Sequence, residues 1–135
     1  MLTENDIVSI LIEHLSRNGY EINQALQTHQ HGIDIIAENA KHILYIEAKG
    51  ETSSKEHTNR YGNAFDKNQI KSHVSRAILA SMKILHEKPA GTKTKVGIAL
   101  PDTTDHRDLV EKILNPIKTL GIKVFFVSDD KVKEQ

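Results

Sequence analysis

The sequence predicts an α/β domain in which a mixed central β-sheet is flanked by helices, in the order α-β-β-β-α-β-α-β. Apolar residues recur at the spacing of an amphipathic helix in three segments. Short runs with strand character lie between them, three in succession after the first helix and two alternating with helices later. Three consecutive strands followed by a strand–helix–strand crossover form a sheet with both antiparallel and parallel neighbours.

The first predicted helix spans residues 3–18. Thr3 is its candidate N-cap, acidic residues follow in the first turn, and an Asn-Gly pair ends it. Its apolar stripe consists of Val8, Leu11, Ile12 and Leu15. Three strands are then expected at residues 20–27, 32–38 and 42–49, and a short polar turn at 38–41 suits a hairpin between the last two.

Residues 50–65 lack periodicity and are expected to form a loop. A second helix should run from about Asp66 to His86. Its apolar stripe consists of Ile70, Val74, Ala77, Ile78, Met82 and Leu85.

A buried strand is expected at 95–101. The third helix follows it and includes residues 103–114. Asn115-Pro116 should end or kink that helix, because proline removes a donor and clashes with the preceding turn. The last strand is expected at 122–128. Residues 1–128 would then form one domain, with 129–135 as a solvated C-terminal tail.

Composition limits the class of protein. The 135 residues suit one domain, and 18 Lys and Arg balance 18 Asp and Glu. The zero net charge excludes a strongly basic, non-specific nucleic-acid binder but allows a local basic face. The absence of cysteine excludes disulfides and thiolate metal sites. Since there is no long apolar run and no basic leader, we expect a cytoplasmic protein without membrane contact.

Three charged residues, Asp34, Glu47 and Lys49, lie within the apolar strand segments. Strand alternation puts Glu47 and Lys49 on the face of Tyr45, and pairing through the 38–41 turn would bring Asp34 beside Glu47. Adjacent carboxylates repel unless a cation neutralises them, and Mg²⁺ prefers such hard oxygen ligands. A neighbouring lysine can orient an attacking water, so the set suits phosphodiester hydrolysis. The alternative is ordinary solvated charges at strand ends.

Gly-Ile-Asp at 32–34, followed after twelve residues by Glu-Ala-Lys at 47–49, resembles the motif of the PD-(D/E)XK nuclease superfamily, which has the restriction-endonuclease-like fold. The pattern looks most like Mrr-type restriction enzymes and archaeal Holliday-junction resolvases, and it covers about residues 3–128. The resemblance implies a deoxyribonuclease that uses Mg²⁺ or Mn²⁺. Asp34, Glu47 and the Ala48 backbone carbonyl would bind the metal ion, and Lys49 would assist the attacking water.

The resemblance suggests two further positions. Relatives often carry a glutamine on the helix after the Glu-x-Lys strand, and Gln69 matches it, on one helix edge with His73 and Arg76. The resemblance implies that Gln69 is a catalytic residue, and this helix edge could contact the metal-bound water or a phosphate. An ordinary solvated helix face is the alternative for all three. Many relatives also have a glutamate on the inward side of the first helix. Here Glu13 falls on the wrong side, so Glu4 is the better candidate for a third metal ligand, although it equally suits the helix dipole.

The span 41–76 holds seven Lys and Arg against four Asp and Glu, which supports a polyanionic partner. The candidate DNA contacts are Lys55, Arg60, Tyr61, Lys67, His73, Arg76 and His31. A transition-metal site from His29, His31 and Asp34 is disfavoured, because alternation places the histidines on the opposite face from Asp34.

The leading hypothesis is a metal-dependent endonuclease acting on DNA. The alternatives are a non-catalytic domain of the same fold that binds nucleic acid or protein, and a small-molecule domain, for which no Gly-rich phosphate loop is present. A single domain leaves little room for a recognition module. Sequence-specific cutting would therefore need a homodimer, which also supplies two cuts, or a partner protein.

Overall fold

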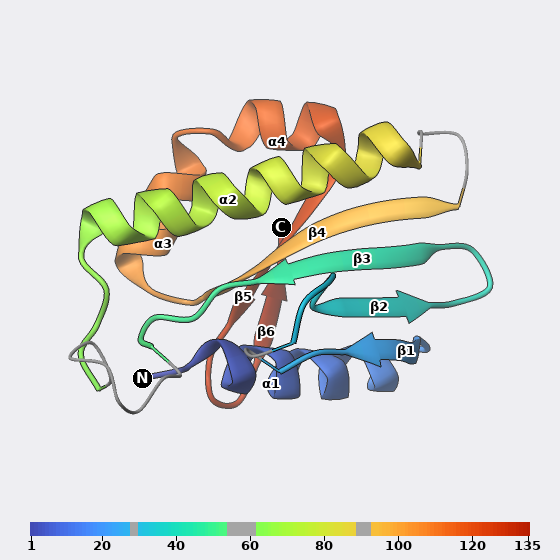
Figure 1. Ribbon diagram of the computed structural model, residues 1–135, viewed down its shortest axis with the longest axis horizontal. Coiled ribbons are helices and arrows are strands. Elements are labelled where there is room, and N and C mark those ends of the chain that lie inside the picture. Colours follow the sequence, from blue (N-terminus) through green and yellow to red (C-terminus); the bar gives the residue numbers. More distant parts are fainter. Residues whose placement is uncertain (28–29, 54–61, 89–92) are drawn as a thin grey trace.

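Six strands form a single sheet in the order β1-β2-β3-β4-β5-β6, in a computed structural model that describes residues 1–27, 30–53, 62–88 and 93–135 (Figure 1). The elements along the chain are α1 (Glu4–Arg17), β1 (Glu21–Ala25), β2 (Ile35–Glu38), β3 (Ile43–Ala48), α2 (Lys67–Glu87), β4 (Thr94–Pro101), α3 (Thr104–Glu111), α4 (Leu114–Leu120), β5 (Ile122–Val127) and β6 (Val132–Glu134). α1 packs on one face of the sheet, and α2, α3 and α4 pack on the other.

The sheet is mixed, as predicted. β1, β2 and β3 pair antiparallel, whereas β3, β4 and β5 are parallel. The carboxyl ends of these three parallel strands therefore meet at one edge of the sheet, and α2 and α3 both begin there. The α/β class and the mixed sheet are confirmed, while a specifically restriction-endonuclease-like fold stays a prediction.

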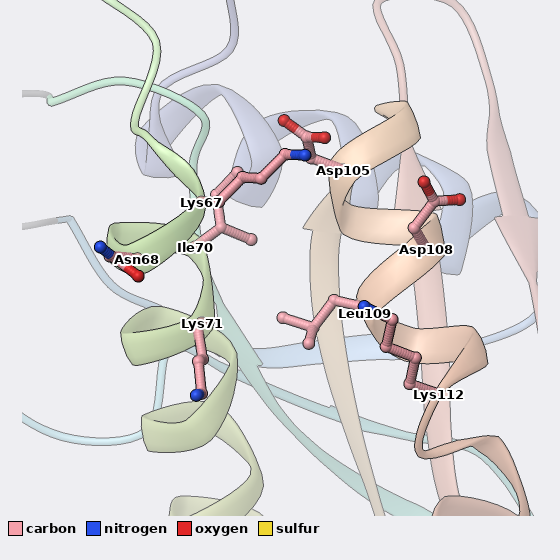
Figure 2. A pocket seen from close by; sticks show the side chains of 8 residues that line it. All are labelled: Lys67, Asn68, Ile70, Lys71, Asp105, Asp108, Leu109 and Lys112. Atoms are coloured by element: carbon pink, nitrogen blue, oxygen red, sulfur yellow. The ribbon is translucent and has the colours of Figure 1, made fainter.

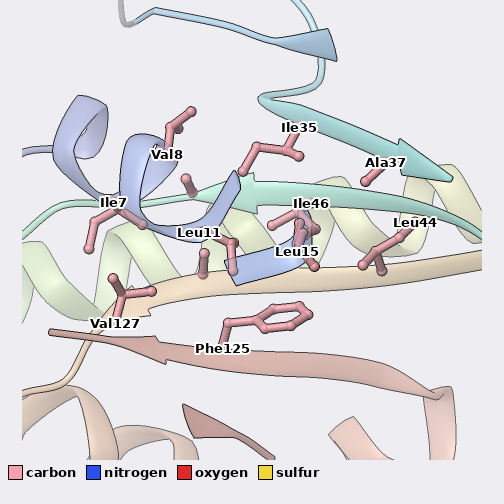
Figure 3. Close-up of a cluster of buried hydrophobic side chains, with 12 residues drawn as sticks. Ile7, Val8, Leu11, Leu15, Ile35, Ala37, Leu44, Ile46, Phe125 and Val127 are labelled. Atoms are coloured by element: carbon pink, nitrogen blue, oxygen red, sulfur yellow. The ribbon is translucent and has the colours of Figure 1, made fainter. Parts of the chain in front are cut away.

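α1 begins with a capping box, in which Asp6 N–H donates to Thr3 Oγ1 at 3.2 Å and Thr3 N–H donates to Asp6 Oδ2 at 2.8 Å. Its buried side chains are Ile7, Val8, Leu11 and Leu15. Figure 3 shows them among the side chains of β2, β3 and β5. The predicted cap and stripe are confirmed, except that Ile12 is only partly buried and Ile7 takes a central place.

α2 spans nearly the predicted residues, and Asp66 caps it. Its buried face differs from the predicted stripe near the end of the helix, where Met82 is 46% exposed while Ser81 and Ile84 are buried. Ser81 tolerates burial because its hydroxyl donates to the Ala77 carbonyl at 3.0 Å. The prediction of Met82 as a core residue was wrong, since the buried face of this long helix lies one residue away from it.

The third predicted helix is two helices, α3 and α4, and the break lies at residues 112–113. Pro116 occupies the first turn of α4 rather than ending α3. A proline is tolerated there because the amide that it lacks would have no partner within the helix.

The C-terminal residues are more ordered than a solvated tail. Their side chains are mostly exposed, as expected, but β6 pairs antiparallel with β5. Gln135 N–H donates to the Val124 carbonyl at 2.8 Å, and half-buried Val132 packs against the α1 face of the core. Backbone pairing stabilises this edge strand, so its sequence carries little apolar signal. Within the described ranges, every helix is too short or too polar to cross a bilayer.

Candidate active site

The folded chain brings Asp34, Glu47 and Lys49 together where β2 begins and β3 ends. Ile35 pairs with Ile46, so Asp34, one residue before β2, lies next to Glu47 across the hairpin. The Ala48 N–H donates to Asp34 Oδ2 at 2.8 Å, and Lys49 Nζ lies 3.6 Å from Glu47 Oε1. One short hairpin thus fixes all three side chains relative to one another.

The chain enters β2 through a bend that Gly32 makes possible. Its φ of +130° lies in the region that side-chain-bearing residues avoid. Two hydrogen bonds then hold the segment to β1: Leu26 N–H donates to the Asp34 carbonyl at 2.8 Å, and the Gln24 side chain donates to the Ile33 carbonyl at 2.7 Å. As a result the Asp34 residue is only 8% exposed.

Strand alternation on β3 follows the prediction. Leu44, Ile46 and Ala48 are buried on the α1 face, whereas Glu47 and Lys49 are half-buried on the other. The core side chains therefore fix the strand, and the charged pair keeps access to solvent at its end.

Glu4, at the start of α1, contributes to the electrostatics of this cluster. Burial, reinforced by the charges of Asp34 and Glu47 and opposed by that of Lys49, raises the pKa of Glu4 to about 7. Glu13, by contrast, is exposed on the far side of the helix. Among the described residues, however, no three His, Cys, Asp or Glu side chains are close enough to hold one metal ion. Glu4 therefore adds charge here without completing a three-carboxylate metal site.

The residues after Lys49 hold α1 in this position, a feature that the sequence analysis missed. A Cβ on Gly50 would lie 2.5 Å from the Glu4 backbone nitrogen, so only glycine permits this approach. Glu51 accepts from Leu2 N–H at 2.7 Å through its side chain, and its own N–H donates to the Leu2 carbonyl at 2.8 Å. A glycine directly after a charged strand end was the available signal, because it often marks a close backbone contact.

Glu51 also connects the site to α2. Its carbonyl accepts from Phe65 N–H at 2.9 Å, one residue before the α2 cap. The starts of both flanking helices are thus attached to the residue two positions after Lys49.

Burial and mutual repulsion destabilise the charged forms of the carboxylates in the cluster. Burial raises the pKa of Asp34, although the Ala48 N–H and Lys49 oppose the shift. Burial and the charge of Asp34 raise the pKa of Glu47, again against Lys49. Three acidic groups therefore share one lysine, and a further cation would relieve the repulsion.

The structure gives Gln69 a role in the α2 cap. Its Oε1 accepts from Asp66 N–H at 2.8 Å, and its own N–H donates to Asp66 Oδ1 at 2.8 Å. The His73 ring packs edge-on against Phe65, with centroids 4.5 Å apart, and Arg76 is exposed on α2. None of these contacts involves the carboxylate cluster.

The remaining predicted DNA contacts divide into two groups. Lys67, the first residue of α2, and His31, before β2, are both exposed. Lys55, Arg60 and Tyr61 lie outside the described residues, as does His29 of the alternative transition-metal site.

Comparisons of the chain with known protein families, with curated proteins and with solved structures found no match.

Proposed function

We propose that the protein is a divalent-metal-dependent endonuclease that hydrolyses DNA phosphodiester bonds. One observation carries this: a buried aspartate, oriented by a backbone N–H, stands beside a Glu-x-Lys strand end whose carboxylates outnumber their lysine. Such a cluster is costly for a protein without a ligand, because buried like charges raise the free energy of the folded state. Perturbed pKa values of this kind gather at functional sites.

Mg²⁺ or Mn²⁺ fits the donor set. Mg²⁺ typically takes one or two protein carboxylates and keeps several waters, so Asp34 and Glu47 suffice without a third acidic ligand. By resemblance, the Ala48 carbonyl would be a further oxygen ligand. When bound, the ion would neutralise the carboxylates and act as a Lewis acid toward water and a phosphoryl oxygen.

The residues of the chain have separable roles. The Ala48 N–H occupies Asp34 Oδ2, which orients the carboxylate and leaves Oδ1 for a ligand. Glu47 keeps the Lys49 ammonium at the strand end, 3.6 Å from its carboxylate. There Lys49 can orient a water for attack on phosphorus and stabilise the charge that develops on the phosphoryl oxygens. The attack of water forms one P–O bond and breaks another; the water gives up a proton to solvent, and the departing ester oxygen takes one up from solvent.

The alternative is a non-catalytic domain that binds nucleic acid or a protein. Two observations favour it: the described residues form no three-ligand metal group, and the Gln69 side chain is used by the α2 cap. This alternative predicts DNA binding that needs neither Mg²⁺ nor Lys49.

Cleavage of plasmid, linear, single-stranded and four-way-junction DNA with Mg²⁺ or Mn²⁺ tests the proposal. Lys49→Ala and Asp34→Asn should abolish cutting, as should EDTA. Lys41→Ala is the matched control, because Lys41 is exposed at the opposite end of the β2–β3 hairpin. Cutting that survives both site variants would place the activity elsewhere. Calorimetric titration with Mg²⁺ would separate a metal-binding but inactive protein from one that binds no metal.

The cytoplasmic location and the homodimer or specificity-supplying partner stay predictions from the sequence. Sedimentation at micromolar concentration checks the dimer, and a monomer would leave the partner protein as the source of specificity.

A further inference from the structure

A hollow lies away from the carboxylate cluster, between α2 and α3 (Figure 2). Its volume is about 230 Å³. Its polar lining consists of Lys67, Asn68 and Lys71 from α2 and of Asp105, Asp108 and Lys112 from α3 and its C-cap. We call it the α2–α3 groove.

The two α2 lysines are poorly placed for the stability of their own helix. Lys67 is the first residue of α2, where the helix dipole is positive, and the first turn after the Asp66 cap contains no acidic residue. Lys71 follows four residues later on the same side, so the two like charges are neighbours. Local helix stability therefore does not explain either lysine.

The α3 charges, in contrast, have local explanations. Asp105 lies in the first turn of α3, where a negative charge is favourable. Asp108 precedes Lys112 by four residues, the favourable order for an opposite-charge pair on a helix. Within the described ranges, no ion pair shorter than 4.0 Å involves Lys67, Lys71 or Lys112. The groove therefore holds three ammonium groups against the two carboxylates of Asp105 and Asp108, an excess of one positive charge for an external anion.

We propose that the α2–α3 groove binds a backbone phosphate of the nucleic acid that the carboxylate cluster cuts, so that it is a second phosphate site of the same enzyme. This rests on the proposed function. A bound anion would offset two unfavourable interactions, the repulsion between Lys67 and Lys71 and that between Lys67 and the positive end of the helix dipole. Anion binding would thus explain why both positions are lysine. The hollow is smaller than the pockets that take drug-sized ligands, and three of its lining residues are lysines, which agrees with a small anionic group.

The position of the groove suits this role. α2 and α3 start at the edge where β3 and β4 end, and the Phe65–Glu51 hydrogen bond holds the residue before the α2 cap to the segment that follows Lys49. The groove therefore lies at the same end of the sheet as the carboxylate cluster. A phosphate contact in the groove would position the substrate without reading its sequence.

Binding measured without metal tests the groove separately from the chemistry. A fluorescein-labelled DNA duplex of mixed sequence is titrated in EDTA over a series of salt concentrations, and fluorescence anisotropy gives the affinity. Lys71→Glu should weaken binding and make the plot of log affinity against log salt less steep by about one unit, the slope of one phosphate contact. Lys67→Glu/Lys71→Glu should reduce the slope further.

Lys83→Glu is the matched control, because it reverses the same charge on an exposed position of α2 far from the groove. If Lys83→Glu changes the slope as much as Lys71→Glu does, the effect is one of general charge and the proposal is overturned. An unchanged slope in the groove variants overturns the groove alone and leaves the nuclease proposal standing. Groove-dependent binding without cleavage on any substrate would overturn the nuclease proposal and leave the groove as a phosphate site of a non-catalytic nucleic-acid-binding domain.

Inorganic phosphate distinguishes a nucleic-acid site from a site for a free anion. Suppose that phosphate raises the melting temperature of the wild type but not of Lys71→Glu, while both bind duplex equally well. The groove would then hold a small anion, and the proposal would be wrong. A wild type that binds no DNA would overturn the groove proposal together with the proposed function.

Discussion

Two charged clusters lie at the ends of neighbouring parallel strands. One has more acidic than basic groups, and the other has more basic than acidic groups. At the end of β3, Asp34, Glu47 and Glu4 each interact electrostatically with one lysine, Lys49, and their pKa values are raised. Just after β4, Asp102 is paired with two cations, Arg107 and Lys133, the latter at 3.5 Å. Although burial raises the pKa of Asp102, its hydrogen bond and charge interaction with Arg107, aided by Lys133, lower it below the usual range.

The difference separates a structural ion cluster from a candidate site. The chain itself supplies the counter-charges of Asp102, so that cluster is complete without a ligand. The β3 cluster has more acid than base and is complete only when a cation arrives. Similar residue types at similar places in the sheet thus have opposite consequences for stability.

The sharpest test of this comparison is to neutralise one acid in each cluster. Asp34→Asn should reduce cleavage by about 100-fold or more, because it removes a ligand of the catalytic ion. It should also raise the melting temperature of the metal-free protein, since the amide can still accept from the Ala48 N–H. Asp102→Asn should do the reverse, lowering the melting temperature and leaving cleavage unchanged. Thermal unfolding measures the change in stability, and the plasmid assay measures the change in cleavage. Equal effects of the two substitutions on stability would contradict the distinction between a structural ion cluster and a candidate site.

Gly50→Ala should destabilise the protein by about 1–3 kcal/mol, because the added methyl group would lie 2.5 Å from the Glu4 nitrogen. We expect weaker Mg²⁺ binding as well, since α1 must shift away from the cluster. Urea unfolding and calorimetric titration check the two effects. Glu51→Gln is the control, because its side-chain oxygen can still accept from Leu2 N–H.

The pH dependence of Glu4→Gln should reveal the raised pKa of Glu4. A raised carboxyl pKa contributes stability that is fully present below the ordinary value of 4.5 and is lost as pH rises through about 7. The variant should therefore be more stable than the wild type at pH 8, by about 2–3 kcal/mol, and this advantage should shrink toward pH 5. Chemical denaturation across this range measures the difference, which would be independent of pH if Glu4 were an ordinary exposed acid.

The comparison with the wild type is needed because His106 titrates in the opposite sense. Burial lowers the pKa of His106 to about 4, so its contribution is lost as pH falls below 6.5. The two trends overlap in the profile of the wild type alone, but that of His106 cancels in the difference between the two proteins.

The smallest expected effect concerns Lys67. Lys67→Glu should stabilise the free protein by about 0.3–1 kcal/mol, because it places an acid at the positive end of the α2 dipole and removes repulsion with Lys71. Lys83→Glu should have no comparable effect. Guanidinium unfolding of both variants checks this, and a loss of stability in Lys67→Glu would show that the lysine has a structural role.

The sequence by itself determined the α/β class, the mixed sheet and the pairing of Asp34 with Glu47. These depend on local rules, namely strand alternation, a short turn and helix caps, which act over a few residues. The split between α3 and α4 and the pairing of β6 escaped these rules. Contacts with the rest of the fold determine the break between α3 and α4 and the pairing of β6 with β5. Such contacts do not alter the spacing of apolar residues in the sequence.

Only the tertiary structure decided what surrounds the hairpin charges. It brought Glu4 near the cluster through the Gly50 and Glu51 contacts, across more than forty residues of chain, and it placed Lys67 and Lys71 opposite α3. Burial and the field of neighbouring charges set the pKa values there, and both depend on which distant segments meet. Periodicity shows which face of a segment is buried, but not which other segment covers it.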